Sequence, residues 1–215
     1  MPRAGKKKSK PRKPRNKKQV KLQNNRPKSP KLTKNRLSEL LACRKPEQKV
    51  LLCLDPATST GLVVLFYTDA ELSVRDLSSG LRGYIDLDDL DKKDKRSRWT
   101  NLMSYLKIIK PDVIYYEETK YMMKYLDAGS VYSKILGVVE TYAYKNLIYC
   151  VGITVPAIRK LLCDNGSADK NKVQEALADK AGILEGQYDT SDALAVAYYA
   201  IATKDYKKYL ECSLI

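Results

Sequence analysis

The hydrophobic pattern of the chain alternates between short apolar runs and longer stretches with helical spacing. The apolar runs predict strands at 50–54, 62–67, 72–77, 113–116 and 147–151. The helical patterns predict helices at 96–109, 130–144, 155–163, 168–181 and 190–203. This order of elements predicts an α/β domain with a mixed five-stranded sheet flanked by helices.

The run at 50–54 is the central strand of this prediction. It has five apolar residues and no polar alternation, which is typical of a strand buried on both faces. It ends at Asp55, and a turn rich in Pro, Thr, Ser and Gly then leads into the next apolar run, which predicts a hairpin. A carboxylate at the end of a buried strand is costly unless a cation such as a divalent metal neutralises it. The structural alternative is that Asp55 only hydrogen-bonds the turn behind it.

Further acids stand at the ends of two other elements. One predicted strand is followed by Glu117 and Glu118, which point to opposite faces, so only one of them can join Asp55. Asp189 and Asp192 are three positions apart at a helix start and therefore share a face near its positive end. Taken separately, the Glu117–Glu118 pair is also explained by solvation of a strand end, and the Asp189–Asp192 pair by helix capping. Together they form an all-oxygen set suited to Mg²⁺ or Mn²⁺.

The residue types that are absent narrow the chemistry. The 215-residue chain has no histidine, which excludes Ser-His-Asp and Cys-His nucleophiles, histidine bases and histidine-ligated zinc. Its five cysteines show no CxxC spacing, and we interpret them as reduced core residues of an intracellular protein. No signal peptide or membrane-length apolar run is found, so we expect a soluble protein without a membrane partner. We also expect no small-molecule cofactor.

The positive charge is concentrated at the N-terminus. Residues 1–46 carry 18 Lys and Arg against one acid, whereas residues 47–215 carry 22 against 24. We predict a disordered basic arm at 1–46, with one helical turn at 38–42, and a folded domain at 47–215. Such an arm indicates a polyanionic partner, and nucleic acid is favoured. An anionic membrane surface, a solubilising tail and a targeting signal are the alternatives.

Four motifs in order resemble one nuclease family. Residues 158–174 are similar to a stretch of the RuvC-type Holliday-junction resolvases, where a basic helix precedes a Gly-Ser-Ala-acid-Lys turn and a helix containing Val-Gln. Asp55-Pro56, Glu117 after a Pro-Asp pair, and Asp189-x-x-Asp192-Ala-Leu-Ala stand where that family has its other motifs. The resemblance covers about residues 50–204 and extends to the RNase H-like, retroviral-integrase nuclease superfamily. The basic arm hints at a phage or viral member.

The resemblance implies a crossover junction endodeoxyribonuclease that acts in DNA recombination and repair. Such an enzyme would be a homodimer that cuts four-way (Holliday) or otherwise branched DNA and uses Mg²⁺, with Mn²⁺ as a substitute. Asp55 would bridge two ions about 3.5 to 4 Å apart, Glu117 and Asp192 would each complete one, and Asp189 would join the second. The resemblance places Lys170 near the scissile phosphate, as a catalytic and DNA-contacting residue.

The resemblance also implies DNA contacts outside the acidic set. Arg159 and Lys160 match the basic helix, Lys120 stands where bacterial members have an aromatic residue near the junction centre, and Tyr121 is adjacent to it. Ala57 departs from the family's usual Asp-Pro-Gly, and Lys120 itself is not aromatic. Strict preference for junctions is therefore the part of the implied activity with the least support.

Two other functions remain open at this point. One is a catalytically silent RNase H-like module that binds structured nucleic acid; the other is an actin-like ATPase, for which the chain lacks a second Gly-rich phosphate loop. For the nuclease we expect a DNA-associated location, in the cytoplasm or nucleoid of a bacterium or phage-infected cell, or in a eukaryotic nucleus.

Overall fold

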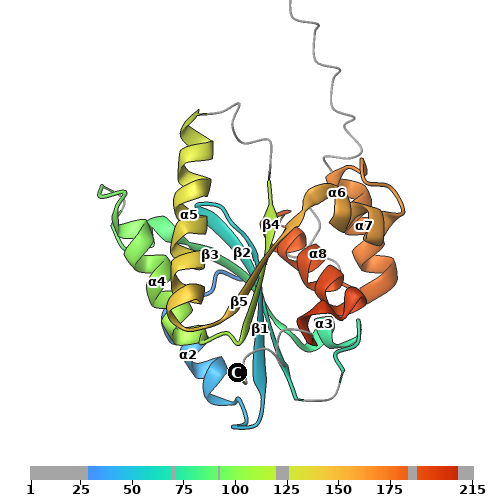
Figure 1. Cartoon of the computed structure of the whole chain (residues 1–215), viewed down its shortest axis with the longest axis horizontal. Coiled ribbons are helices and arrows are strands. Elements are labelled where there is room, and N and C mark those ends of the chain that lie inside the picture. The colour runs from blue at the N-terminus through green and yellow to red at the C-terminus, as the bar shows by residue number, and fades with distance from the viewer. Residues whose placement is uncertain (1–28, 69–70, 92, 120–125, 184–187, 208–215) are drawn as a thin grey trace, which may run out of the picture.

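The computed structural model describes residues 29–68, 71–91, 93–119, 126–183 and 188–207, whose centre is a mixed five-stranded sheet (Figure 1). The strands are β1 (Lys49–Asp55), β2 (Ser59–Tyr67), β3 (Leu81–Asp86), β4 (Val113–Glu118) and β5 (Tyr149–Thr154). Their order is β3-β2-β1-β4-β5; β1, β4 and β5 are parallel, and β2 is antiparallel to β1 and β3. The predicted fold class is confirmed.

Helices cover both faces of the sheet (Figure 1). One face carries α2 (Lys34–Ala42), α4 (Ser97–Ile109) and α5 (Leu126–Lys145). The other carries α3 (Asp76–Ser79), α6 (Val155–Cys163), α7 (Lys170–Ala181) and α8 (Tyr188–Thr203). Two short 3-10 turns, η1 (Leu87–Asp89) and η3 (Asp205–Lys207), complete the described elements. None of the helices formed by the described residues is long and apolar enough to cross a membrane.

The alternation along β1 divides the core into two layers. Leu51 and Cys53 belong to the layer under α8, whereas Val50, Leu52 and Leu54 belong to the layer under α4 and α5. All five side chains are buried, as their unbroken apolar run predicts. The last residue of the strand, Asp55, continues the alternation on the α8 side.

Two predicted strands are placed differently by the structure. Residues 72–77 form a turn and the start of α3, because the Asp76 carboxylate accepts hydrogen bonds from the Ser73 backbone N–H at 2.6 Å and its hydroxyl at 2.9 Å. The third strand is instead β3. The fifth strand begins later than predicted, because Leu147 follows α5 with a left-handed backbone and the Ile148 N–H donates to the Ala143 carbonyl at 2.8 Å.

The folded part begins earlier than predicted. Leu32 and Leu37, inside the predicted arm, are fully buried against the layer under α4. The Leu32 N–H donates to the Tyr84 carbonyl of β3 at 2.8 Å, and Thr33 caps α2. Residues 29–46 therefore belong to the domain and not to a disordered arm. The prediction for 1–28 lies outside the described residues.

Candidate nuclease site

Asp55 and Glu117 end neighbouring parallel strands. The register of β1 and β4 pairs Leu54 with Tyr116, so the next residues, Asp55 and Glu117, follow side by side, with backbones about 5 Å apart. Both side chains continue the face covered by α8, because Cys53 and Tyr115, two residues earlier, lie in that layer. The carboxyl ends of parallel strands are where open α/β sheets usually place their sites.

Helix α8 brings the second acidic pair to this edge. Asp189 is half-buried in its first turn, and Asp192 is only 6% exposed. The approach is very close at Gly61, which pairs with Asp55 across β1 and β2. A Cβ atom at position 61 would lie 1.9 Å from the Asp189 carbonyl oxygen. Only glycine allows α8 to begin this close to the sheet.

Lys170 connects α7 to the acidic edge. Its Nζ lies 2.5 Å from Asp192 Oδ2, and its side chain is about half exposed whereas that of Asp192 is buried. A buried hydrogen bond of 3.1 Å joins Gln174 Nε2, one turn after Lys170 on α7, to Oγ of Ser191, which precedes Asp192 on α8. The ion pair therefore rests on a fixed contact between the two helices.

The electrostatics show that the carboxylates influence one another. Burial raises the pKa of Asp55 well above its usual range, and the charges of Glu117 and Asp192 raise it further, while Lys170 opposes the shift. Burial and the Asp192 charge raise the pKa of Glu117 to about 7, against the opposing charges of Lys170 and Arg159. The four acids thus form one electrostatic unit that favours a cation.

The ion pair between Lys170 and Asp192 partly neutralises the negative charge of these acids. Burial raises the pKa of Asp192 even though Lys170 lies beside it, and the Asp192 charge raises the pKa of Lys170 despite the partial burial of the lysine. Among the described residues, no group of three or more Asp, Glu, Cys or His is close enough to hold a metal ion together. The carboxylates converge on one edge without closing on a single point.

Tyr132 of α5 fixes the end of β4. Its hydroxyl donates to the Glu117 carbonyl at 2.8 Å and accepts from the Thr119 N–H at 2.9 Å. The side chain is buried, so the two bonds are shielded from water. Tyr132 thus anchors the backbone on both sides of the last β4 residue and limits where Glu117 can point.

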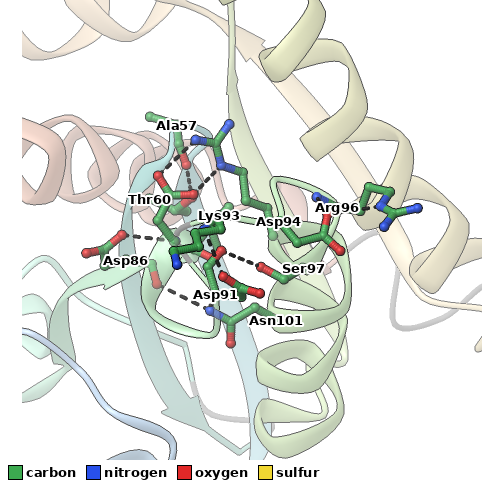
Figure 2. A network of polar contacts seen from close by, with 12 residues as sticks. Ala57, Thr60, Asp86, Asp91, Lys93, Asp94, Arg96, Ser97 and Asn101 are labelled. Carbon is green, nitrogen blue, oxygen red and sulfur yellow. Dashed lines mark hydrogen bonds and ion pairs between the residues drawn. The ribbon is translucent and has the colours of Figure 1, made fainter.

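A polar network supports the turn that follows Asp55 (Figure 2). The Thr60 hydroxyl donates to the Ala57 carbonyl within the turn, and the Leu87 N–H donates to the Thr58 carbonyl at 2.9 Å. Asn101 of α4 is buried and donates to the carbonyls of Asp86 and Leu87 at 3.3 and 3.1 Å. These bonds tie the hairpin turn to β3 and α4 and so hold the end of β1 in place.

The predicted DNA-contacting residues have different positions. Arg159 lies on α6 close enough for its charge to lower the pKa values of Glu117 and Asp192, so it faces the acidic edge. Lys160 is exposed and donates to the Asp164 carbonyl at 3.2 Å, at the C-terminal end of the same helix. Lys120 and Tyr121 lie outside the described residues.

Three further residues contribute to the site without having been predicted as site residues: Gly61, Tyr132 and Gln174. A glycine inside an apolar strand signals a close approach of another backbone, so Gly61 had a readable signal. Gln174 belongs to the Val-Gln pair of the 158–174 motif, but its hydrogen-bond partner 17 residues away could not be predicted from that motif. Tyr132 had no signal, because its role depends on a tertiary neighbour 15 residues away in the chain.

Comparison with known proteins agrees with this geometry at the level of fold. Thermus thermophilus RuvC in complex with a Holliday junction substrate superposes with a TM-score of 0.55 and 17% identity, over 72% of this chain and 96% of that chain. The chain shares the RuvC fold. A second Thermus thermophilus RuvC structure gives 0.52 and 19% over the same shares. Yeast mitochondrial Ydc2, a Holliday junction resolvase, superposes with a TM-score of 0.49 and 11% identity, over 82% of this chain and 86% of that chain.

Sequence comparison adds no relative. No protein-family model matches the chain, and no curated protein matches it. The expected resemblance to RuvC-type resolvases is therefore confirmed in the fold, and the activity has to be argued from the site itself.

Proposed function

We propose that the protein is a divalent-metal-dependent endonuclease that cleaves branched DNA, with four-way junctions as the leading substrate. The observation that carries the proposal is the side-by-side placement of Asp55 and Glu117 on parallel strands, facing Asp192 of α8. The RuvC fold adds weight, because one of the similar structures is bound to a Holliday junction.

The donor chemistry of the site suits Mg²⁺ or Mn²⁺. Asp55, Glu117, Asp189 and Asp192 supply only hard carboxylate oxygens, and with Lys170 and Arg159 the fully ionised set has a net charge of −2. One divalent ion would neutralise this charge. For the second expected ion, the substrate phosphate would supply part of the compensating negative charge. Because Lys170 neutralises Asp192, holding ions on all four acids requires a rearrangement of this pair. When bound, such ions activate water and stabilise the leaving 3′-oxygen.

The cationic side chains have their own tasks. Lys170 places a half-exposed ammonium beside the acids, where it can bind the scissile phosphate in exchange for Asp192. Arg159 supplies a second positive charge on the same side and reduces repulsion between the acids and the DNA backbone. Both contacts orient a phosphodiester over the carboxylates, which is where in-line attack would take place.

The wider assignment includes the N-terminal arm and a second subunit. Residues 1–28 contain 13 Lys and Arg and no acid, which favours contact with DNA phosphates outside the site. A symmetric cut of a four-way junction needs two sites, so a homodimer is part of the proposal. Lys160, Lys120 and Tyr121 remain proposed DNA contacts.

The decisive experiment compares Asp55→Asn with the parent protein on a labelled four-way junction, a flap, an RNA/DNA hybrid and a linear duplex in Mg²⁺. We expect the parent to cut the junction fastest and Asp55→Asn to lose cleavage while keeping junction binding. Asp179→Asn is the matched control, because Asp179 is exposed on α7. Undiminished cleavage by Asp55→Asn would refute the proposal that these acids hold the catalytic metal ions.

A second candidate is a silent module that binds structured nucleic acid. The absence of a three-carboxylate group among the described residues is the observation that favours it. Calorimetric titration with Mg²⁺ and a cleavage assay distinguish the two candidates. The nuclease should bind ions through Asp55 and cleave the junction, whereas the silent module should bind the junction without binding ions or cleaving it.

A further inference from the structure

A basic hollow lies at the end of the sheet opposite to the acids. It has a volume of about 1100 Å³ and is lined by Lys49, Lys107, Lys110 and Lys145, which we call the lysine groove. Lys49 begins β1, Lys107 lies in the last turn of α4, Lys110 caps that helix, and Lys145 ends α5. The start of β1 and the C-terminal ends of α4 and α5 lie in the lower half of the domain in Figure 1, near α2. A smaller hollow beside it shares Lys107 and Lys110 and adds Arg44.

The charge of the groove departs from that of the domain around it. Residues 47–215 carry slightly more acids than bases, yet the groove has four lysines and one acid, Asp112. Asp112 is already engaged: it accepts from the Val50 N–H at 2.6 Å and pairs with Arg44 at 3.5 Å. Lysines in a last helical turn also stabilise the helix end, which accounts for Lys107 and Lys145 singly. It does not account for the hollow that these lysines line together.

The backbone at the groove also adopts a conformation that is unfavourable for its residues. Lys110 and Leu147 both line the hollow and have φ angles of 49° and 54°, in the left-handed region that is unfavourable for residues other than glycine. Glycine is the usual residue at such helix ends. Leu147 is also 87% exposed, so no burial in the domain offsets the cost. The same backbone conformation occurs at two other helix ends, at Asp164 and Lys204, so it is the charge and the shape of the hollow that distinguish it.

We infer that the lysine groove is a second DNA-binding surface, which holds the phosphate backbone of a duplex arm whose branch point lies at the acidic edge. This rests on the proposed function, since it assigns a further contact to the same substrate. Phosphates are favoured as the occupant because four ammonium groups match a regular row of single negative charges. Leu147 at the rim supplies an apolar contact for the sugar edges between phosphates.

The distance between the two surfaces makes the inference testable. Lys49 and Asp55 are the first and last residues of one strand, so six residue steps of about 3.3 Å separate them by roughly 20 Å. Phosphates on one strand of a duplex are about 3.4 Å apart along the axis, so roughly six base pairs span this distance. An arm shorter than this cannot occupy both surfaces, whereas a longer arm can.

The experiment uses the full chain and junctions of two sizes. One set has arms of about five base pairs closed by hairpin loops, and the other has arms of about twenty. The variant combines Lys107→Gln, Lys110→Gln and Lys145→Gln. Its control removes the same charge from exposed lysines outside the groove, through Lys93→Gln, Lys95→Gln and Lys180→Gln. Dissociation constants are measured across a series of salt concentrations, with circular dichroism to confirm folding.

We expect the groove variant to bind long-armed junctions at least tenfold more weakly and to lower the salt slope by about 2 to 3, because about 0.9 counterions are released per phosphate contact. Binding of short-armed junctions should not change relative to the control. Equal losses on both junction sizes, equal losses in the control, or no loss at all would each overturn the inference. Absence of cleavage by the parent protein in Mg²⁺ would instead count against the proposed function, so the two failures are distinct.

Discussion

Gly61→Ala is predicted to damage catalysis through the position of α8. The added methyl group would lie 1.9 Å from the Asp189 carbonyl oxygen and 2.4 Å from its carbonyl carbon. Both atoms belong to backbone, so no side chain can rotate away. Either the start of α8 or the hairpin that carries Gly61 has to move.

The size of the movement follows from the geometry. Contacts of a Cβ atom are essentially never shorter than 3.0 Å, so the 1.9 Å approach requires a shift of at least 1.1 Å. Because Gly61 pairs with Asp55, this shift separates Asp55 from Asp189 and Asp192. A displacement of about 1 Å in a catalytic constellation costs on the order of 100-fold in rate. Overpacking also lowers the free energy of unfolding by about 1–3 kcal/mol.

Single-turnover cleavage of a four-way junction, at a temperature where all variants are folded, measures this effect. Gly137→Ala is the matched control, since Gly137 lies within α5 and a Cβ there meets nothing within 4 Å. We expect that control to keep full activity and to gain about 0.5–1 kcal/mol in stability. A Gly61→Ala enzyme with the parent's cleavage rate would show that the close approach of α8 does not set the geometry of the acids.

Two further predictions concern Tyr132 and Glu117. Tyr132→Phe removes both hydrogen bonds at the end of β4, so single-turnover cleavage should slow about tenfold while the affinity for the junction stays unchanged. If the cleavage rate and the junction affinity fell by the same factor, a general folding defect would be the explanation. Because burial and Asp192 raise the pKa of Glu117 from 4.5 to about 7, metal-free protein should lose stability as the pH rises through this interval, by at most about 3 kcal/mol. Urea unfolding in EDTA tests this, and Glu117→Gln should flatten the profile; an equally steep decline in that variant would refute the assignment.

Strand periodicity carried most of the correct sequence prediction. The uninterrupted apolar runs of β1 and β4 are unambiguous because both strands are buried on both faces, and each run ends directly before its acid. Edge strand β3 was missed, since Arg82 and Gly83 interrupt its pattern and it needs burial on one side only. Residues 72–77 show apolar alternation but turn, because Asp76 binds the backbone locally.

The ion pair between Lys170 and Asp192 could not be predicted from the sequence. The two residues stand at the starts of α7 and α8, and nothing in their spacing states that these starts meet. The Gln174–Ser191 bond creates that meeting, and it is a tertiary contact with no local pattern. Convergence of acids on a sheet edge is predictable from register, whereas the pairing of each acid is decided by side-chain packing.

Small residues decide how closely the elements that carry the acids can meet. Helix α8 contacts β1, β2 and β4, and Ala193, Ala197 and Ala200 are fully buried on it, so its backbone lies close to the sheet. Gly61 extends the same principle to the first turn, where Asp189 stands. A larger side chain at any of these positions would push α8 outward and would carry Asp189 and Asp192 away from the ends of β1 and β4 together. The acids therefore form a unit because of the residues beneath them, and substitutions in that layer should affect cleavage without touching a carboxylate.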